Sequence, residues 1–124
     1  MIISKGSIGR FWINYSPSII HINSYFGSGM DYWLYSNKNI NDQKWHFITA
    51  TFDKDGYEKI YIDGVFNVQM DISAAASIPW SSADNLMFST SYVGNYFKGF
   101  VDEVRIYNRL LSAEEIKRHY EMSK

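Results

Sequence analysis

The run from Tyr57 to Ile72, YEKIYIDGVFNVQMDI, restricts the fold of this chain more than any other segment. Two stretches of alternating apolar and polar residues flank the dipeptide Asp63-Gly64. Alternation with a period of two is typical of a half-buried β-strand, and Asp-Gly suits a type I′ turn because both residues tolerate positive φ. The segment therefore predicts an antiparallel hairpin. We expect the apolar residues of its second arm, Phe66 included, on the same side as the isoleucines of the first arm or diagonal to them.

Alternating runs bounded by turn residues recur along the rest of the chain. We expect further strands over residues 8–15, 19–26, 31–36, 44–53, 86–90 and 99–108. Near the end, Ser112 and Glu115 form the S-x-x-E pattern of a helix capping box, with Leu111 and Ile116 at the two staple positions. Many short strands and one terminal helix predict an all-β fold, a two-sheet antiparallel β-sandwich with a short C-terminal helix.

Length, charge and composition narrow the functional classes. The 124 residues suffice for one domain, which we expect to span residues 1–124. The formal net charge is −1 and no more than two Lys or Arg residues follow one another, which argues against a nucleic-acid-binding surface. No apolar run approaches the roughly 18 residues of a membrane span, and residues 1–7 lack the apolar core of a signal peptide. Without cysteine, the chain has no disulfide and no thiolate metal site.

Two carboxylates stand side by side in the predicted strand 99–108, at Asp102 and Glu103. Adjacent residues of a strand point to opposite faces, so these two side chains cannot converge on one substrate atom. Glycoside hydrolysis needs two carboxylates on either side of one bond, which a single strand provides at a spacing of two, as in E-x-D-x-E. No predicted strand contains such a pair. We therefore expect that this protein is not an enzyme.

Asp102 would share its face of the predicted strand with the apolar residues Phe100, Val104 and Ile106. A carboxylate on an apolar face must accept hydrogen bonds or bind a cation. Two interpretations follow. Either backbone and side-chain donors near the strand end satisfy Asp102, or the residue is a calcium ligand.

Aromatic and amide residues in two predicted loops are candidates for ligand binding. Trp80 stands in a loop of small residues, and Asn95 and Tyr96 lie in a second loop. An aromatic ring can stack on a sugar ring while neighbouring amide groups hydrogen-bond its hydroxyls. Trp80, Asn95 and Tyr96 are therefore candidate carbohydrate-binding residues. The alternative for Trp80 is that it covers one end of the core.

Three stretches resemble one known family when they are taken together. They are KWHFITATFD from Lys44, YEKIYIDGV from Tyr57, and FKGFVDEVRIYNRLLSAEEI from Phe97. In this order they resemble the laminin-G-like, concanavalin A-like jelly-roll domains of the lectin/glucanase type, over roughly residues 1 to 120. The resemblance implies a two-sheet antiparallel jelly roll that acts as a non-catalytic module in bacterial secreted or surface proteins. Some relatives hold a structural calcium, to which Asp102 would contribute by motif, and the glucanases among them carry the E-x-D-x-E strand that this sequence lacks.

Relatives of this kind usually begin with one or more strands before the segment that corresponds to IISKGS, residues 2–7. A jelly roll without those strands would leave backbone groups unpaired and a seam open in the core. We therefore expect a domain that lacks the first strand or strands of the family: a domain fragment, a homo-oligomer that covers the seam, or a rearranged sandwich.

The function that we expect is a carbohydrate-binding (lectin-like) or adhesion module, extracellular or at the cell surface as part of a larger protein. The alternative is a structural, protein-interaction or oligomerisation module of such a protein. The expected partners are a carbohydrate or another protein chain, and calcium is the cofactor to test.

Overall fold

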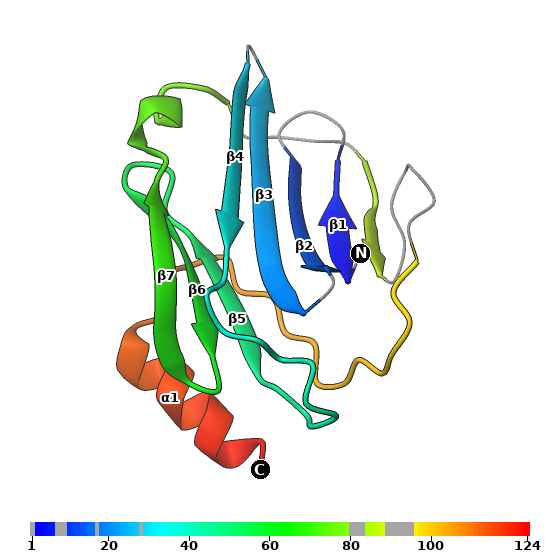
Figure 1. Cartoon of the computed structure of the whole chain (residues 1–124). Helices are drawn as coiled ribbons and strands as arrows, with labels where there is room; N and C mark the ends of the chain where they lie inside the picture. Colours follow the sequence, from blue (N-terminus) through cyan, green and yellow to red (C-terminus); the bar gives the residue numbers. More distant parts are fainter. Residues whose placement is uncertain (1, 7–9, 17, 28, 80–83, 89–95) are drawn as a thin grey trace.

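The computed structural model describes residues 2–6, 10–16, 18–27, 29–79, 84–88 and 96–124. Its strands form two antiparallel sheets, one with the order β4-β3-β2-β1-β8 and one with the order β5-β6-β7 (Figure 1). The five-stranded sheet contains β1 (Ile3–Lys5), β2 (Arg10–Ser16), β3 (Ile19–Gly27), β4 (Met30–Tyr35) and β8 (Leu86–Phe88). The three-stranded sheet contains β5 (Ile48–Phe52), β6 (Tyr57–Ile62) and β7 (Val65–Asp71). A 3-10 turn η1 (Ser73–Ala75) and the helix α1 (Ala113–Met122) complete the described elements.

The main core lies between the two sheets. Ile20, Ile22 and Leu34 of the five-stranded sheet form one buried cluster with Ile60 and Ile62 of the three-stranded sheet. These positions alternate along β3 and β6, because every second side chain of a strand points to the same face. The predicted two-sheet antiparallel sandwich is therefore confirmed.

The hairpin at the centre of the sequence is also confirmed, with one correction. Asp63 and Gly64 have φ values of 56° and 74°, as a type I′ turn requires at both central positions. A register shift between Ile60 and Tyr61 then places an extra residue in β7. Because of this bulge, Phe66 pairs with Tyr61, their ring centroids 5.8 Å apart, and not with the core isoleucines.

The terminal helix begins at the predicted capping box. The Ser112 hydroxyl accepts a hydrogen bond from the Glu115 backbone N–H at 3.2 Å, and the Glu115 carboxylate accepts one from the Ser112 N–H at 2.9 Å. The helix packs by the β6–β7 turn, where Ile116 is fully buried (Figure 1). Among the described residues, no helix has the length and apolar character to span a bilayer.

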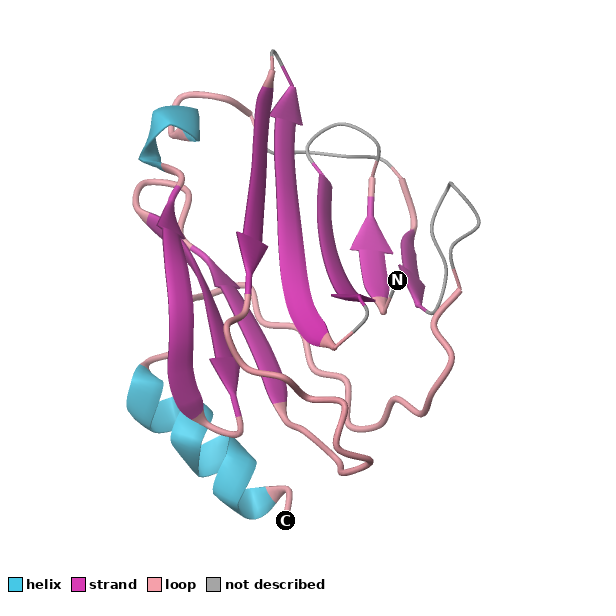
Figure 2. Cartoon of the chain, in the orientation of Figure 1, coloured by secondary structure: helices cyan, strands magenta, loops and turns pink. Residues whose placement is uncertain are grey.

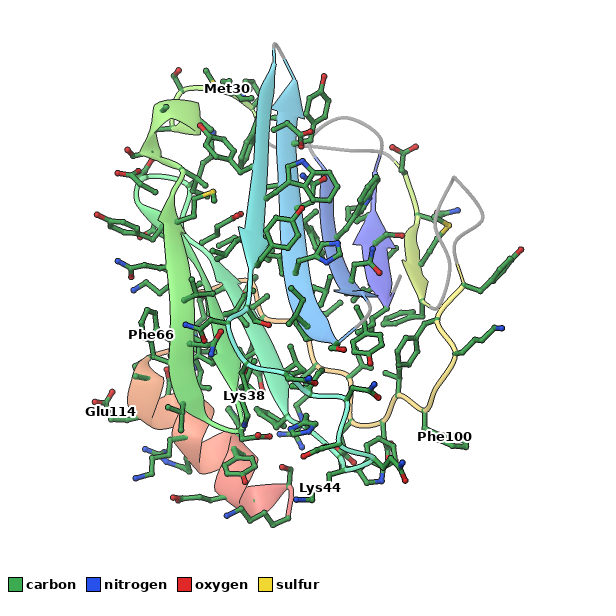
Figure 3. The ribbon with its side chains drawn as sticks, in the orientation of Figure 1. Met30, Lys38, Lys44, Phe66, Phe100 and Glu114 are labelled. Atoms are coloured by element: carbon green, nitrogen blue, oxygen red, sulfur yellow. The ribbon has the colours of Figure 1, made fainter. Side chains whose placement is uncertain are left out.

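The segment after β8 differs most from prediction. Residues 99–108 have a strand-like sequence, yet the structure holds them as an extended loop between β8 and α1 (Figure 2). Glu103 has a φ of 52°, in the left-handed region. Phe100 is 86% exposed, and in Figure 3 its ring points away from the sandwich. The prediction of a strand here is wrong, because an alternating sequence forms a strand only beside an edge that accepts its backbone hydrogen bonds.

Candidate functional site

The side of the five-stranded sheet that faces away from the core is rich in rings and amides. Its three long strands are in register, so that Trp12 lies opposite Asn23 and Asn23 opposite Trp33. Two residues away on β3, on the same face, His21 lies between Asn14 of β2 and Tyr35 of β4. We call this surface the outer aromatic face and define it by Trp12, Asn14, His21, Asn23, Asp31, Trp33 and Tyr35.

The rings of the outer aromatic face contact one another across the three strands. Trp33 and Tyr35, two residues apart on β4, are stacked with centroids 6.4 Å apart and planes at 14°. The His21 ring lies 5.8 Å from Trp33 and 5.2 Å from Tyr35. Trp12 meets Trp33 edge-on at 6.3 Å. Because Tyr35 is 51% exposed and the two tryptophans are half-buried, the face offers aromatic surface to a ligand.

Two polar atoms beneath these rings have unused hydrogen-bonding capacity. The side-chain amide of Asn23 donates to Asp31 Oδ1 at 2.6 Å and to the Tyr32 carbonyl at 2.8 Å. Asn23 Oδ1 and His21 Nδ1 are buried, and neither has a hydrogen-bond partner within the described part of the chain. A buried polar atom without a partner costs about 1–3 kcal/mol. Both atoms therefore keep hydrogen-bonding capacity that no described residue uses.

Burial favours the neutral form of the His21 imidazole. Burial lowers the pKa of His21 below its ordinary value, and a nearby positive charge acts in the same direction. A neutral ring has one nitrogen that donates and one that accepts, so His21 can match either end of a hydroxyl group. This versatility suits recognition of a polyhydroxylated ligand.

The predicted residues that the structure describes, Tyr96 and Asp102, do not belong to the outer aromatic face. Trp80 and Asn95 fall outside the described residues, and Tyr96, 74% exposed, lies on the segment after β8. Asp102 is exposed, and its Oδ1 accepts the Glu103 backbone N–H at 2.8 Å. The described residues contain no group of three or more His, Cys, Asp or Glu side chains placed to hold a metal ion. The strand face that drew attention to Asp102 does not form, and its calcium role stays a prediction.

A second hollow lies at the open side of the sandwich. This cavity, of about 970 Å³, is bounded by β5, by the segment 97–111 and by the inner side chains of β1 and β2. Apolar side chains line most of it, among them Phe11, Ile48 and Val104. We call it the seam cavity. In the described part of the chain three strands face five, and no described strand covers β1 and β2, which leaves this hollow.

A charged network joins the loop before β5 to the β6–β7 turn. Asp63 accepts from Lys38 at 2.6 Å and faces His46 Nδ1 at 3.0 Å, while His46 Nε2 lies 2.8 Å from Asp42. Burial lowers the pKa of His46, but the hydrogen bonds to the two carboxylates outweigh it and the pKa lies above its ordinary value. The network fixes the rim of the seam cavity, to which His46 contributes.

Among the residues that the structure describes, Glu58 is the one carboxyl group that is fully buried in the core. Glu58 of β6 is fully buried and accepts a hydrogen bond from the Ser24 hydroxyl of β3, which joins the two sheets. Its Oε1 has no hydrogen-bond partner among the residues described. Burial raises the pKa of Glu58 to about 7, against the smaller lowering effect of the Ser24 hydrogen bond. This acid lies between the sheets, on the opposite side of β3 from the outer aromatic face.

Sequence reasoning missed the outer aromatic face although its signal was present. Within the predicted strands, the patterns W-x-N, H-x-N and D-x-W-x-Y place rings and amides on the residues that alternate with the core positions. A face buried beneath another element would carry apolar residues at those positions. Rings mixed with amides on three consecutive strands therefore indicate a polar, aromatic outer face, which is a candidate binding surface.

Comparisons with known proteins agree with this architecture. The family model for the concanavalin A-like lectin/glucanases superfamily, of the laminin-G type, matches residues 1–117. A solved structure, an S-layer domain-containing protein (residues 221–444) from Clostridium thermocellum ATCC 27405, is similar with a TM-score of 0.55 and 21% sequence identity. The similarity covers 90% of this chain but only 56% of that one, and at this identity it shows the fold alone. A search of curated proteins found no match. On the family match, this chain belongs to the laminin-G-like domains of the concanavalin A-like lectin/glucanase superfamily.

Proposed function

We propose that this chain is a non-catalytic carbohydrate-binding module of a cell-surface protein, and that its outer aromatic face is the binding site. One observation carries the proposal. Trp12, Trp33 and Tyr35 share a sheet face with two buried polar atoms, His21 Nδ1 and Asn23 Oδ1, that have no hydrogen-bond partner among the described residues.

The chemistry of a sugar matches this combination of groups. A pyranose ring has apolar C–H faces that pack on aromatic rings and a rim of hydroxyls that both donate and accept hydrogen bonds. Trp33 and Tyr35 would contact the ring faces, while His21 and Asn23 would meet hydroxyls. Asp31 adds a negative charge at the edge of the face, which favours neutral sugars over acidic ones.

Family membership and the structural comparison support the same proposal. The superfamily includes lectins, and the similar solved structure is that of an S-layer domain-containing protein. A cell-surface location for this chain is therefore part of the proposal. The sequence-predicted residues Trp80, Asn95 and Tyr96 define the alternative loop site for the same ligand class.

A glycan array probed with the wild type and with Trp33→Ala tests the proposal. We expect the wild type to bind at least one neutral glycan, and Trp33→Ala to bind it about tenfold more weakly, because loss of a stacked ring removes about 1.5 kcal/mol. Trp45→Ala is the matched control, since Trp45 is 70% exposed but lies in the loop before β5. The control should bind as the wild type does.

Three results would count against the proposal. Failure to bind any glycan, with and without calcium, would reject carbohydrate binding altogether. Equal loss in Trp33→Ala and Trp45→Ala would separate binding from the outer aromatic face. Turnover of a polysaccharide by the purified protein would show that the module is catalytic.

A further inference from the structure

The segment 99–109 exposes apolar side chains that a stable surface normally covers. Phe100 is 86% exposed, Ile106 61%, and Val101, Val104 and Tyr107 between 40% and 48%. Their exposed surface is on the order of 600 Å², close to the roughly 800 Å² that each partner buries in a standard protein interface. Part of this surface lines the seam cavity, and the total is at the upper end of what a monomer normally exposes, which makes the segment a candidate interaction surface.

The backbone of this segment also lacks a strand partner. None of the strand pairings in the described part of the chain involves residues 99–109, and the seam cavity separates them from β5. Glu103 departs from extended geometry with a φ of 52°, a conformation that is unfavourable for a residue other than glycine. Pairing with another strand would supply partners for the backbone groups and let Glu103 return to an extended conformation.

The sequence of the segment is complementary to itself in one antiparallel register. In a two-fold symmetric pair centred on Val104, Glu103 of one copy lies opposite Arg105 of the other, and the same contact forms twice. In that register Val101 lies opposite Tyr107, an apolar–aromatic pair that stabilises sheets. On the other face, Phe100 lies diagonal to Ile106 of the other copy and Val104 lies opposite Val104, while Asp102 lies directly opposite Ile106 at the edge of this apolar contact.

Neighbouring registers are unfavourable. In a two-fold symmetric antiparallel pair, the register can shift only in steps that keep directly opposite side chains on the same face of the sheet. The next register in one direction places Glu103 opposite Glu103 of the second copy, and the next in the other direction places Arg105 opposite its own counterpart. Like charges directly opposite are destabilising, so the charge pattern specifies the register centred on Val104.

We propose that the segment 99–109 is a homodimer interface, which pairs antiparallel about Val104 with the same segment of a second copy of this chain. The Glu103–Arg105 ion pair within each copy, at 3.0 Å, is replaced by a pair between copies at each of the two symmetric contacts, so the number of ion pairs does not change. The interface is independent of the outer aromatic face, which lies on β2, β3 and β4. A dimer would present two ligand-binding faces, which raises avidity for a repeating surface ligand if the proposed function holds.

The mass in solution tests this proposal. Sedimentation equilibrium from micromolar to submillimolar concentration should show a species of twice the 14.5 kDa chain mass that dissociates on dilution. Arg105→Glu places like charges opposite each other at both contacts and should weaken the dimer by about tenfold or more. The double variant Glu103→Arg/Arg105→Glu restores opposite charges and should recover the dimer.

Lys117→Glu is the matched control, because this charge reversal lies on the exposed side of α1 and should leave the mass distribution unchanged. Far-UV circular dichroism checks that each variant is folded. A monomer at every concentration overturns the proposal. So does a dimer that Arg105→Glu does not weaken, or a double variant no better than the single one.

Discussion

The free energy of unfolding should fall by about 3 kcal/mol as the pH rises from about 4.5 to above 7, because of Glu58. In the folded protein, burial raises the pKa of this carboxyl from 4.5 to about 7. Between these two values the folded state binds a proton at Glu58 that the unfolded state has released. The stabilisation that Glu58 contributes is therefore fully present below about pH 4.5 and is lost as the pH rises through about 7.

Urea unfolding at a series of pH values for the wild type and Glu58→Gln measures this effect. The glutamine mimics the protonated acid and still accepts from Ser24, so its stability should not show the Glu58 decline. His46, whose pKa lies above its ordinary value, contributes a decline of the same sign near neutral pH in both proteins, and the difference between the two curves removes it. Parallel curves across this pH range would show that Glu58 ionises in the folded state as it does in water.

Asp63→Ala should destabilise the fold by about 2 kcal/mol, because one side chain serves the turn and the adjoining loop together. Asp63 Oδ1 accepts the Phe47 backbone N–H at 3.1 Å, and its Oδ2 holds Lys38 and His46. The Lys38 side chain is 45% exposed, so that ion pair adds little. Most of the loss comes from the unpaired Phe47 N–H and from alanine at a φ of 56°.

Asp63→Asn is the matched variant for this prediction. Asparagine tolerates positive φ and keeps an oxygen for the Phe47 N–H, but it carries no charge. We expect it to cost less than half as much as alanine in urea unfolding. If asparagine costs as much as alanine, charge and not turn geometry stabilises this corner of the fold.

The parts of the fold that were predictable depend on neighbouring residues in the sequence. The Asp63-Gly64 turn and the Ser112 cap each follow from a few adjacent residues, and the structure has both. The strand expected at 99–108 does not form, since a strand also needs an edge beside it and the seam cavity lies there. The bulge in β7 that turns Phe66 away from the core has no signature in the neighbouring residues either.

The candidate site was harder to predict because it depends on register. Trp12, Asn23 and Trp33 are far apart in the sequence, and only the pairing of β2, β3 and β4 places them side by side. His46 and Asp63 are also separated in the sequence, and they meet only because the β6–β7 turn lies beside the loop before β5. Aromatic residues in loops, such as Tyr96, can be recognised from the sequence without knowing how the strands pair. For this reason they were the first candidates.

Mapping of a bound glycan onto backbone amides tests the central claim most directly. ¹H–¹⁵N NMR spectra of the labelled protein would be recorded while the glycan identified on the array is added. We predict the largest shift changes in β2, β3 and β4, around Trp12, Asn23 and Trp33. Shift changes confined to the loops that contain Trp80 and Tyr96, with β2 to β4 unchanged, would contradict the assignment of the outer aromatic face as the binding site.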